Sequence, residues 1–346
     1  MKFTNYIYII TAIVIIGFII RAFNSKNYQT IDGFAQGGTY HLVYNHPKNL
    51  TLTTNDIKEL VEKHFDKINK SLSGYDSTSI ISLINQGENP PLDSIFIECF
   101  TISKEIYNQT DGLFDISAAP LFDIWGFGFK NRENVTQEKI DSIKQFVGMD
   151  KLEIIYNPNN NMHYLQKKDA RAKINFNAIA QGYTCDYIGK ILEQLGINNY
   201  LIEVGGEILC KGLNKYGKEW TIGIDKPLDG NFIPGQEFES IISVSNKGVV
   251  TSGNYRKFYI EDGEKISHTI NPITGYPVKH NLLCATVIAE TSAIADAYAT
   301  YFMVLGLDKS KEFLIKKSNF DALLVYGEQD KMKVFSTAGI KQKKSN

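Results

Sequence analysis

The chain has 346 residues, 43% of them hydrophobic, which is enough for one large globular domain or two smaller ones. Its formal net charge is −1, so it lacks the surplus of Lys and Arg typical of proteins that bind nucleic acid, and we expect no nucleic acid partner. The four cysteines have neither C-x-x-C nor zinc-site spacing. Buried thiols are the simplest expectation, with a disulfide outside the cytoplasm as the alternative.

Residues 6–20, YIYIITAIVIIGFII, form an uncharged block near the amino terminus. A helix of this length covers about 23 Å, short of the roughly 30 Å hydrocarbon core of a bilayer, but extension to Phe3 and Phe23 makes a thin span. No small-residue cleavage site follows Arg21. We therefore expect residues 1–26 to be an uncleaved signal anchor, with a removed signal peptide as the alternative. Either one makes the protein exported or membrane-tethered.

The remaining residues, 27–346, contain no internal repeat and no Pro-rich or Ser-rich linker, and we expect them to form one domain. Apolar periodicity and capping residues predict helices over residues 54–70, 79–85, 93–110, 136–147, 178–195, 290–306 and 309–317. Alternating patterns predict strands over residues 33–44, 152–156, 162–166, 171–176, 200–204, 221–225, 240–245 and 283–289. A hairpin that turns at Asp262-Gly263 and a last hairpin at the end of the chain are also expected. Residues 114–129 are too rich in aromatic residues, Gly and Pro for a regular element, so a loop that lines a pocket is expected there. These elements predict an α+β fold of mainly antiparallel strands with packed helices.

The helix predicted over residues 290–306 is almost wholly apolar, but it contains Asp296 and, four residues later, Thr300. This spacing places a carboxylate and a hydroxyl on one face of the helix among alanine residues. A buried carboxylate without a partner is costly, so a cation must meet Asp296. The helix alone leaves two interpretations open. Both oxygens hold a hard ion such as Mg²⁺, or Asp296 pairs with a Lys or Arg while Thr300 bonds to its own helix.

Seven segments of the chain, in their order and spacing, resemble the ApbE family of FAD:protein FMN transferases. Four of them are NAIAQGYTCD (177–186), EVGGEI (203–208), SHTINPITGYP (267–277) and IADAYATYFMVLG (294–306). The other three are LSGYDSTSIISLIN (72–85), GLFDISAAPLFDIWGFG (112–128) and VVTSGNYRKFY (249–259). The similarity extends over most of the chain after the expected anchor.

The resemblance implies a single ApbE-like domain that is a Mg²⁺-dependent transferase with FAD as its substrate. Such an enzyme moves the FMN moiety, through its phosphate, onto a Ser or Thr hydroxyl of an acceptor flavoprotein and releases AMP. The acceptors are subunits of membrane redox complexes, and the chemistry takes place on the periplasmic side of the inner membrane. This location agrees with the anchor expected at residues 1–26.

By the same resemblance, Asp296 and Thr300 are the side-chain metal ligands, and the carbonyl of Ala178 completes the protein set. His268 lies at the site, where an imidazole with a near-neutral pKa could take the proton from the acceptor hydroxyl. Asp296 could share this role as base, and a structural His268 bonded to a loop carbonyl is the alternative. The positions implied to bind FAD are Gly37, Tyr75, Leu113, Phe114, Asp115, Asn175, Gln181 and Ile270.

Some of these positions have a second interpretation. Tyr75 suits stacking on a flavin or adenine ring but could be an ordinary surface tyrosine, and Asp115 could cap the turn before Ser117. Gln181 stands where family members commonly have Lys, so a cation near the phosphates is missing, although Gln can still donate hydrogen bonds. Gly37-Gly38-Thr39 stands where Met-Gly-Thr is common. Two other functions stay open: a metal-dependent FAD pyrophosphatase, in which water replaces the protein hydroxyl, and a tethered flavin-binding protein without turnover.

Overall fold

The structure is a computed structural model that describes residues 27–228, 235–255, 257–316, 319–329 and 331–343. The anchor expected at residues 1–26 lies outside these ranges. None of the helices inside them combines the length and the hydropathy that crossing a bilayer requires.

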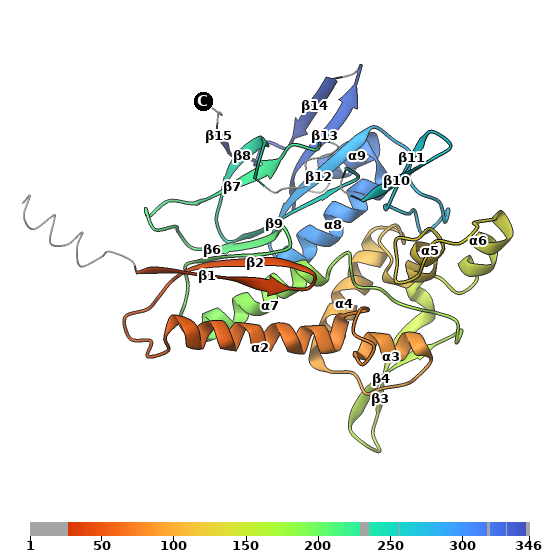
Figure 1. The fold of residues 1–346 in the computed structure, drawn as a ribbon, viewed down its shortest axis with the longest axis horizontal. Coiled ribbons are helices and arrows are strands. Elements are labelled where there is room, and N and C mark those ends of the chain that lie inside the picture. Colours follow the sequence, from red (N-terminus) through yellow and green to blue (C-terminus); the bar gives the residue numbers. More distant parts are fainter. Residues whose placement is uncertain (1–26, 229–234, 256, 317–318, 330, 344–346) are drawn as a thin grey trace, which may run out of the picture.

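The centre of the fold is an eight-stranded sheet in which every neighbouring pair of strands is antiparallel. Its strand order is β1-β2-β5-β6-β9-β12-β13-β14, from the amino-terminal hairpin at one edge to the β13–β14 hairpin at the other (Figure 1). The strands are β1 (Tyr28–Ala35), β2 (Gly38–Asn45), β5 (Tyr200–Val204), β6 (Glu207–Lys211), β9 (Lys247–Gly253), β12 (Leu282–Ala289), β13 (Asp321–Glu328) and β14 (Lys331–Ser336). The expected α+β fold with mainly antiparallel strands is confirmed.

Helices cover one face of this sheet, and a second sheet covers the other. On the helical face, α7 (Ala180–Gln194) packs against β5 and β6, and α8 (Ser292–Leu305) packs against β9 and β12. Beyond them lie α2 (Thr54–Leu72), which contacts α7, and α4 (Ser94–Gln109), which contacts α8 (Figure 1). The helices α7 and α8 are therefore enclosed between the sheet and an outer helical layer, which explains the apolar surface of α8.

The opposite face packs on a three-stranded sheet with the order β15-β8-β7. Its strands are β7 (Trp220–Asp225), β8 (Phe238–Val244) and β15 (Gln342–Lys343). Trp220 and Ile242 from the small sheet meet Val249 and Leu323 from the large sheet in a separate core. Because side chains alternate along a strand, both faces of the central strands are buried.

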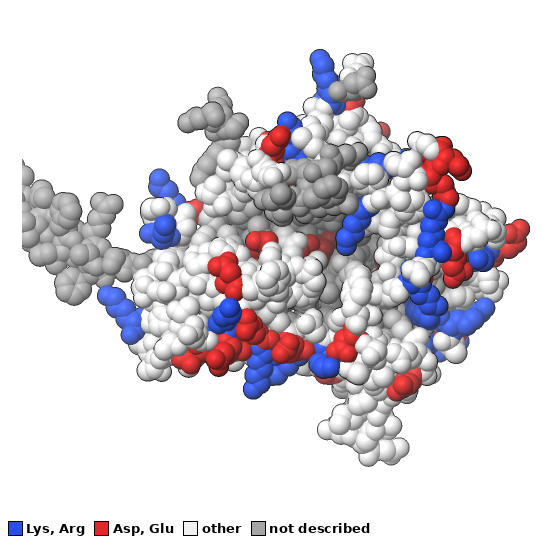
Figure 2. Space-filling view, viewed as in Figure 1, with Lys and Arg blue, Asp and Glu red and all other residues white. Residues whose placement is uncertain are grey.

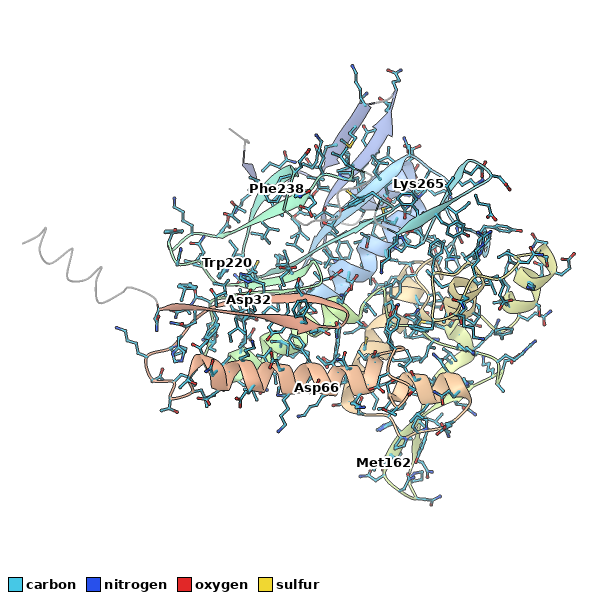
Figure 3. All side chains as sticks on the ribbon, viewed as in Figure 1. Asp32, Asp66, Met162, Trp220, Phe238 and Lys265 are labelled. Atoms are coloured by element: carbon cyan, nitrogen blue, oxygen red, sulfur yellow. The ribbon has the colours of Figure 1, made fainter. Side chains whose placement is uncertain are left out.

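Smaller elements surround this body. They are α3 (Ile80–Gln86), a 3₁₀ turn (Ile116–Ala118), α5 (Ala119–Ile124), α6 (Gln137–Lys144), a second 3₁₀ turn (Met149–Lys151), β3 (Leu152–Asn157), β4 (Met162–Lys167), β10 (Phe258–Glu261), β11 (Glu264–Ser267) and α9 (Leu307–Lys316). The β3–β4 hairpin, where Figure 3 labels Met162, projects away from the other elements. On the face shown in Figure 2, acidic and basic side chains form small interspersed groups, which fits the nearly balanced charge of the chain.

The structure corrects several expected elements. Residues 171–176 are not a strand, because the side chain of Asn85 pairs with both the N–H and the carbonyl of Ile174, at 2.9 and 2.8 Å, and so replaces a strand partner. The loop expected over residues 114–129 contains a 3₁₀ turn and α5, since Pro120 in the first turn of α5 is compatible with a helix. The strand expected over residues 33–44 is divided between β1 and β2 by a turn at Gln36 and Gly37, and the strands β6, β9 and β15 were not predicted. All four cysteines are buried free thiols, as expected.

Candidate active site

Helix α8 contributes the central carboxylate of the site. It begins after Thr291, whose hydroxyl accepts a hydrogen bond from the N–H of Ile294 at 3.2 Å, and it ends at Gly306, which has a φ of 82°. Both caps follow from the sequence. Asp296 is 4% exposed, one helical turn after Ser292 at the start of α8.

Asp296 accepts one hydrogen bond from another element: the backbone N–H of Gly182 on α7 donates to Oδ2 at 3.1 Å. Among the residues that the structure describes, Asp296 pairs with no Lys or Arg, so the ion-pair interpretation finds no partner there. Burial raises the pKa of Asp296 above its ordinary value, and the nearby charge of Asp186 adds to this effect. A cation at this point would reverse the shift.

The carbonyl of Ala178 is free because of the same contact. In a continuous helix, the N–H of Gly182 would donate to the carbonyl four residues earlier, which is that of Ala178. It donates to Asp296 instead, and α7 begins only at Ala180. Within the described part of the chain, no backbone N–H donates to the Ala178 carbonyl. A main-chain oxygen is thus available in the turn that contacts Asp296.

Thr300 adds a third oxygen on the face of α8 that bears Asp296. Its Oγ1 lies 3.4 Å from Oγ of Ser252 on β9, and it makes no hydrogen bond to a carbonyl of its own helix. A carboxylate, a hydroxyl and a carbonyl are the oxygen ligands that hard cations prefer. Over the described ranges, no group of three or more His, Cys, Asp or Glu side chains could hold a metal, so a cation here would depend on main-chain and hydroxyl oxygens as well as on a carboxylate.

Asp186 is a residue of this region that the sequence analysis did not single out. Its Oδ1 and Oδ2 accept hydrogen bonds from the N–H groups of Ser292 and Ala293, both at 2.8 Å, at the first turn of α8. Burial raises the pKa of Asp186 to about 7, and these two donors oppose that rise. The signal in the sequence was its spacing of four residues from Gly182, which puts both on one face of α7.

Two glycine turns meet beside the start of α7. Gly37, with a φ of 78°, and Gly38 form the tip of the β1–β2 hairpin, and a Cβ on Gly38 would lie 3.4 Å from the Cα of Gly205 in the β5–β6 turn. A Cβ on Gly205 would lie 2.2 Å from Nε2 of Gln181. The structure therefore brings Gly37 and Gln181, far apart in the sequence, to the same junction. The positive φ values of Gly37 and Gly205, 78° and 67°, are what favour glycine in these two turns.

Tyr75 lies on the wall of a cavity of about 270 Å³. Its ring is 77% exposed and contacts Phe129 edge to face, with ring centroids 5.1 Å apart. Lys130 and Lys173 also line the cavity, together with Asn85, Asp123 and two serines. Two aromatic rings and two cations around one opening suit a ligand with an aromatic base and phosphate groups. Phe129 and the two lysines were not singled out from the sequence.

Three further positions implied to bind FAD lie in the hydrophobic cores or pack against them. Phe114 is 2% and Ile270 is 1% exposed, and both side chains belong to hydrophobic cores, so these side chains do not face an open site. Leu113 is half-buried beside Phe114 and packs against the same core.

Asp115 and Asn175 lie on two neighbouring segments, because the N–H of Asn175 donates to the carbonyl of Ile116 at 2.8 Å. Asp115 caps the turn before Ser117, accepting from its N–H at 2.7 Å and from its hydroxyl at 2.6 Å, as its second interpretation proposed. Burial raises the pKa of Asp115 to about 6. Oδ1 of Asn175 accepts from the N–H of Asn177 at 2.7 Å, which leaves its amide N–H₂ to donate.

His268 is half-buried after β11, and the geometry determines its tautomer. Nδ1 lies 3.0 Å from the carbonyl oxygen of Lys257. Because a carbonyl only accepts, Nδ1 carries the proton and Nε2 keeps a lone pair. Burial lowers the pKa of His268 to about 4, below the near-neutral value expected from sequence. The next residue, Thr269, donates from Oγ1 to Oδ1 of Asn254 at 2.6 Å. Asn254 follows β9 two residues after Ser252, whose Oγ lies 3.4 Å from Oγ1 of Thr300 on α8.

Comparison with known proteins gives a consistent result. The ApbE family model matches residues 37–324. An Escherichia coli (strain K12) protein named FAD:protein FMN transferase is 32% identical over 291 residues, which cover 83% of this chain and 81% of that protein. A Haemophilus influenzae protein of the same name is 33% identical over 302 residues, 86% of each chain.

Solved structures resemble the whole fold. The flavin transferase ApbE from Vibrio cholerae has a TM-score of 0.78 and 26% identity, and the match covers 90% of this chain and 98% of that one. The flavinyl transferase ApbE from Pseudomonas stutzeri, in its apo form, has a TM-score of 0.79 and 28% identity over 90% of this chain and 95% of that one. The fold and the relatives thus define an enzyme of the flavin transferase class. The chain belongs to the ApbE family.

Proposed function

We propose that this enzyme transfers the FMN moiety of FAD, through its phosphate, onto a Ser or Thr hydroxyl of an acceptor flavoprotein and releases AMP in a Mg²⁺-dependent reaction. One observation carries the proposal: Asp296 is buried with no cationic partner among the described residues, and the free carbonyl of Ala178 and the hydroxyl of Thr300 accompany it. In a member of the ApbE family, this oxygen set supports a cation that faces the phosphates of FAD.

The residues present fit Mg²⁺. Asp296 and Thr300 would hold it by their side chains and Ala178 by its carbonyl, leaving further positions for phosphate oxygens, which is the usual pattern for this ion. A bound Mg²⁺ supplies neutralisation of the charge that develops on the phosphates. In the part of the chain that the structure describes, the N–H of Gly182 is the partner of Asp296 and no cationic side chain meets it, so its buried charge is poorly compensated without a cation.

The protein's own contribution to FAD binding is orientation. Tyr75 and Phe129 offer aromatic surface, and Lys130 and Lys173 offer charge at the same cavity. Gln181 donates hydrogen bonds beside the glycine junction, where Gly37 allows a close approach of the ligand. The remaining contacts to FAD would come from the side chains of Asp115 and Asn175. Backbone groups would add to them, from Leu113, Phe114 and Ile270.

His268 is suited to act as general base. Its Nε2 lone pair accepts the proton of the acceptor hydroxyl while that oxygen forms a bond to the phosphorus of FMN. The pyrophosphate P–O bond breaks at the same phosphorus, and the bonding electrons leave with AMP. Since the imidazole is neutral at physiological pH, it needs no prior loss of a proton.

The location of the enzyme is also a proposal. Residues 6–20 are uncharged and apolar, and no small-residue cleavage site follows them. We infer that residues 1–26 anchor the chain in the inner membrane, with the catalytic domain of residues 27–346 on the periplasmic side. An acceptor that is a subunit of a membrane redox complex would lie within reach of an enzyme tethered in this way.

The test is AMP release from FAD and Mg²⁺ by the full-length protein in detergent, with and without a purified flavoprotein subunit of a membrane redox complex. Release that requires the acceptor, with flavin covalently bound to a Ser or Thr, is the expected result. Release without an acceptor would identify a pyrophosphatase, and flavin binding with no release would identify a non-catalytic binder.

A matched pair of variants ties the result to the site. Asp296→Asn should abolish Mg²⁺-dependent release while the chain stays folded, because the amide keeps the size and loses the charge. Asp66→Asn, on the exposed side of α2 (Figure 3), should change nothing. Full activity of Asp296→Asn at an unchanged Mg²⁺ requirement would overturn the ligand assignment.

A further inference from the structure

The helices α7 and α8 hold each other through reciprocal contacts between carboxylates and backbone. Asp186 on α7 accepts from the N–H groups of Ser292 and Ala293 at the start of α8, both at 2.8 Å. Asp296 on α8 accepts from the N–H of Gly182 near the start of α7, at 3.1 Å. Each helix thus supplies a carboxylate to the first turn of the other, and the two pairs lie one helical turn apart on both helices.

These contacts act on groups that a helix cannot satisfy by itself. The first N–H groups of a helix have no partner within it, and a negative charge near them is favourable. The Thr291 side chain satisfies one such group of α8, that of Ile294. Asp186 satisfies two more, and it does so from a different element. Thr291 therefore stabilises the end of α8, whereas Asp186 also fixes where that end lies relative to α7.

The position of α8 decides where Asp296 and Thr300 point. A helix turns by about 100° per residue, so a small rotation of α8 about its axis would move both side chains away from the turn that contains Ala178. The free carbonyl of Ala178 lies in the turn that leads into α7, and Asp296 belongs to α8. A shared cation needs both helices in one relative position. Gly182 permits the close approach, since a Cβ there would lie 2.4 Å from the carbonyl oxygen of Ser292.

We propose that Asp186 is a positioning residue for the metal site: by holding the first turn of α8 against α7, it brings the carboxylate of Asp296, the hydroxyl of Thr300 and the carbonyl of Ala178 to one point. The inference rests on the proposed function for the identity of the cation. We assign Asp186 a positioning role and not that of a ligand, because each of its two oxygens accepts a hydrogen bond from an N–H group of α8. Its role resembles that of the partners behind the ligands of other metal sites, whose loss lowers metal affinity by about 10–100-fold.

The experiment compares Asp186→Asn with Thr291→Ala in the full-length protein. An asparagine keeps the size of the side chain but has only one accepting oxygen for two N–H donors. Mg²⁺ affinity is measured by calorimetry without FAD and by the rise in melting temperature with Mg²⁺ concentration. FAD affinity is measured separately in a chelator by flavin fluorescence. Neither measurement depends on turnover.

For Asp186→Asn, we expect Mg²⁺ affinity to fall by about 10–100-fold and FAD affinity in chelator to stay within about twofold of wild type. AMP release should recover when Mg²⁺ is raised in proportion. Thr291→Ala removes a cap from the same helix and should lower the melting temperature by about 2 °C without a change in Mg²⁺ affinity. Asp186→Glu keeps the charge but lengthens the side chain, and an intermediate loss of affinity is expected.

Two results would overturn the inference. One is wild-type Mg²⁺ affinity in Asp186→Asn. The other is a loss of affinity in Thr291→Ala equal to that in Asp186→Asn, which would make the role purely one of helix stability. If Asp186→Asn does not fold, Asp186→Glu decides by the same two measurements. Absence of Mg²⁺ binding by the wild-type protein would overturn the proposed function as well, and so differs from a failure of this inference alone.

Discussion

Gly182 lies against Asp296 without space for a side chain between them. The N–H of Gly182 donates to Oδ2 of Asp296 at 3.1 Å, and a Cβ on Gly182 would lie 2.8 Å from the Cβ of Asp296. This single contact frees the carbonyl of Ala178 and gives the buried carboxylate its one hydrogen bond from another helix. The metal site that we propose therefore depends on the lack of a Cβ at Gly182 as well as on the three ligands.

Gly182→Ala should therefore separate α7 from α8. The added methyl group would collide with backbone of α8, which cannot move aside as a flexible side chain can, so we expect a loss of about 1–3 kcal/mol in the free energy of unfolding. AMP release should be lost with it. Gly327→Ala is the control, since a Cβ there has no neighbour within 4 Å. Chemical denaturation of both variants checks the prediction, and wild-type stability of Gly182→Ala would contradict it.

Asp115 should make stability depend on pH. Burial raises its pKa from the ordinary 3.8 to about 6, so the folded chain retains a proton that the unfolded chain has lost. Stability from this group is present below about pH 4 and falls as the pH rises to about 6. The melting temperature of Asp115→Asn should approach or exceed that of wild type over this interval. Curves for the two proteins that run parallel between pH 4 and 8 would contradict the assigned pKa.

His268 should limit transfer through its Nε2 lone pair. His268→Ala should lower single-turnover FMN transfer by roughly 10²–10⁴ while FAD and Mg²⁺ still bind, because a positioned base is worth about that much. With the pKa lowered to about 4, the wild-type rate should be flat across neutral pH and fall only as the pH drops towards 4. A structural His268 would instead lower the melting temperature and weaken FAD binding. Near wild-type transfer by the variant would remove the base assignment.

Gln181 stands at the glycine junction without a charge. Gln181→Lys should tighten FAD binding by roughly fivefold, or about 1 kcal/mol, because a charged donor bonds phosphate more strongly than an amide does. Gln194→Lys adds the same charge at the exposed far end of α7 and should have no effect. Flavin fluorescence titration measures both. Equal affinities for the two variants would place Gln181 outside the phosphate-binding region.

Removal of residues 1–26 should give a soluble and active enzyme, because the strand that follows them, β1, begins at Tyr28 and the candidate site lies wholly within the domain. The full chain should fractionate with membranes at its full mass. Fractionation and mass spectrometry of the cellular protein check both points. A mature amino terminus beyond Ile20 would replace the anchor with a cleaved signal peptide.

Local signals in the sequence predicted the element that carries the site. The apolar run, the cap at Thr291 and the glycine at position 306 define α8, and the spacing of Asp296 and Thr300 identified their shared face. These features depend on residues within one or two helical turns of each other. The same holds for α2, which the structure ends two residues later than predicted.

Features that depend on distant partners were not predictable in this way. The strands β6 and β9 do not alternate between buried and exposed residues; they are defined by their pairing, β6 with β5 and β9, and β9 with β12. Asn85 satisfies the backbone of Ile174 from 89 residues away, so the pattern of residues 171–176 wrongly indicated a strand. The role of Asp186 could not be predicted, because the N–H groups that it binds lie on α8, 106 and 107 residues away in the sequence.

The reciprocal helix contacts also bear on when the site can form. They join residues that are 106 and 114 positions apart in the sequence, so they form only when α8 packs on α7 after the long segment between the two helices has been looped back. No amino-terminal fragment that stops before α8 can assemble the site. Because a chain is synthesised from its amino terminus, the proposed metal site can form only after α8 has been made.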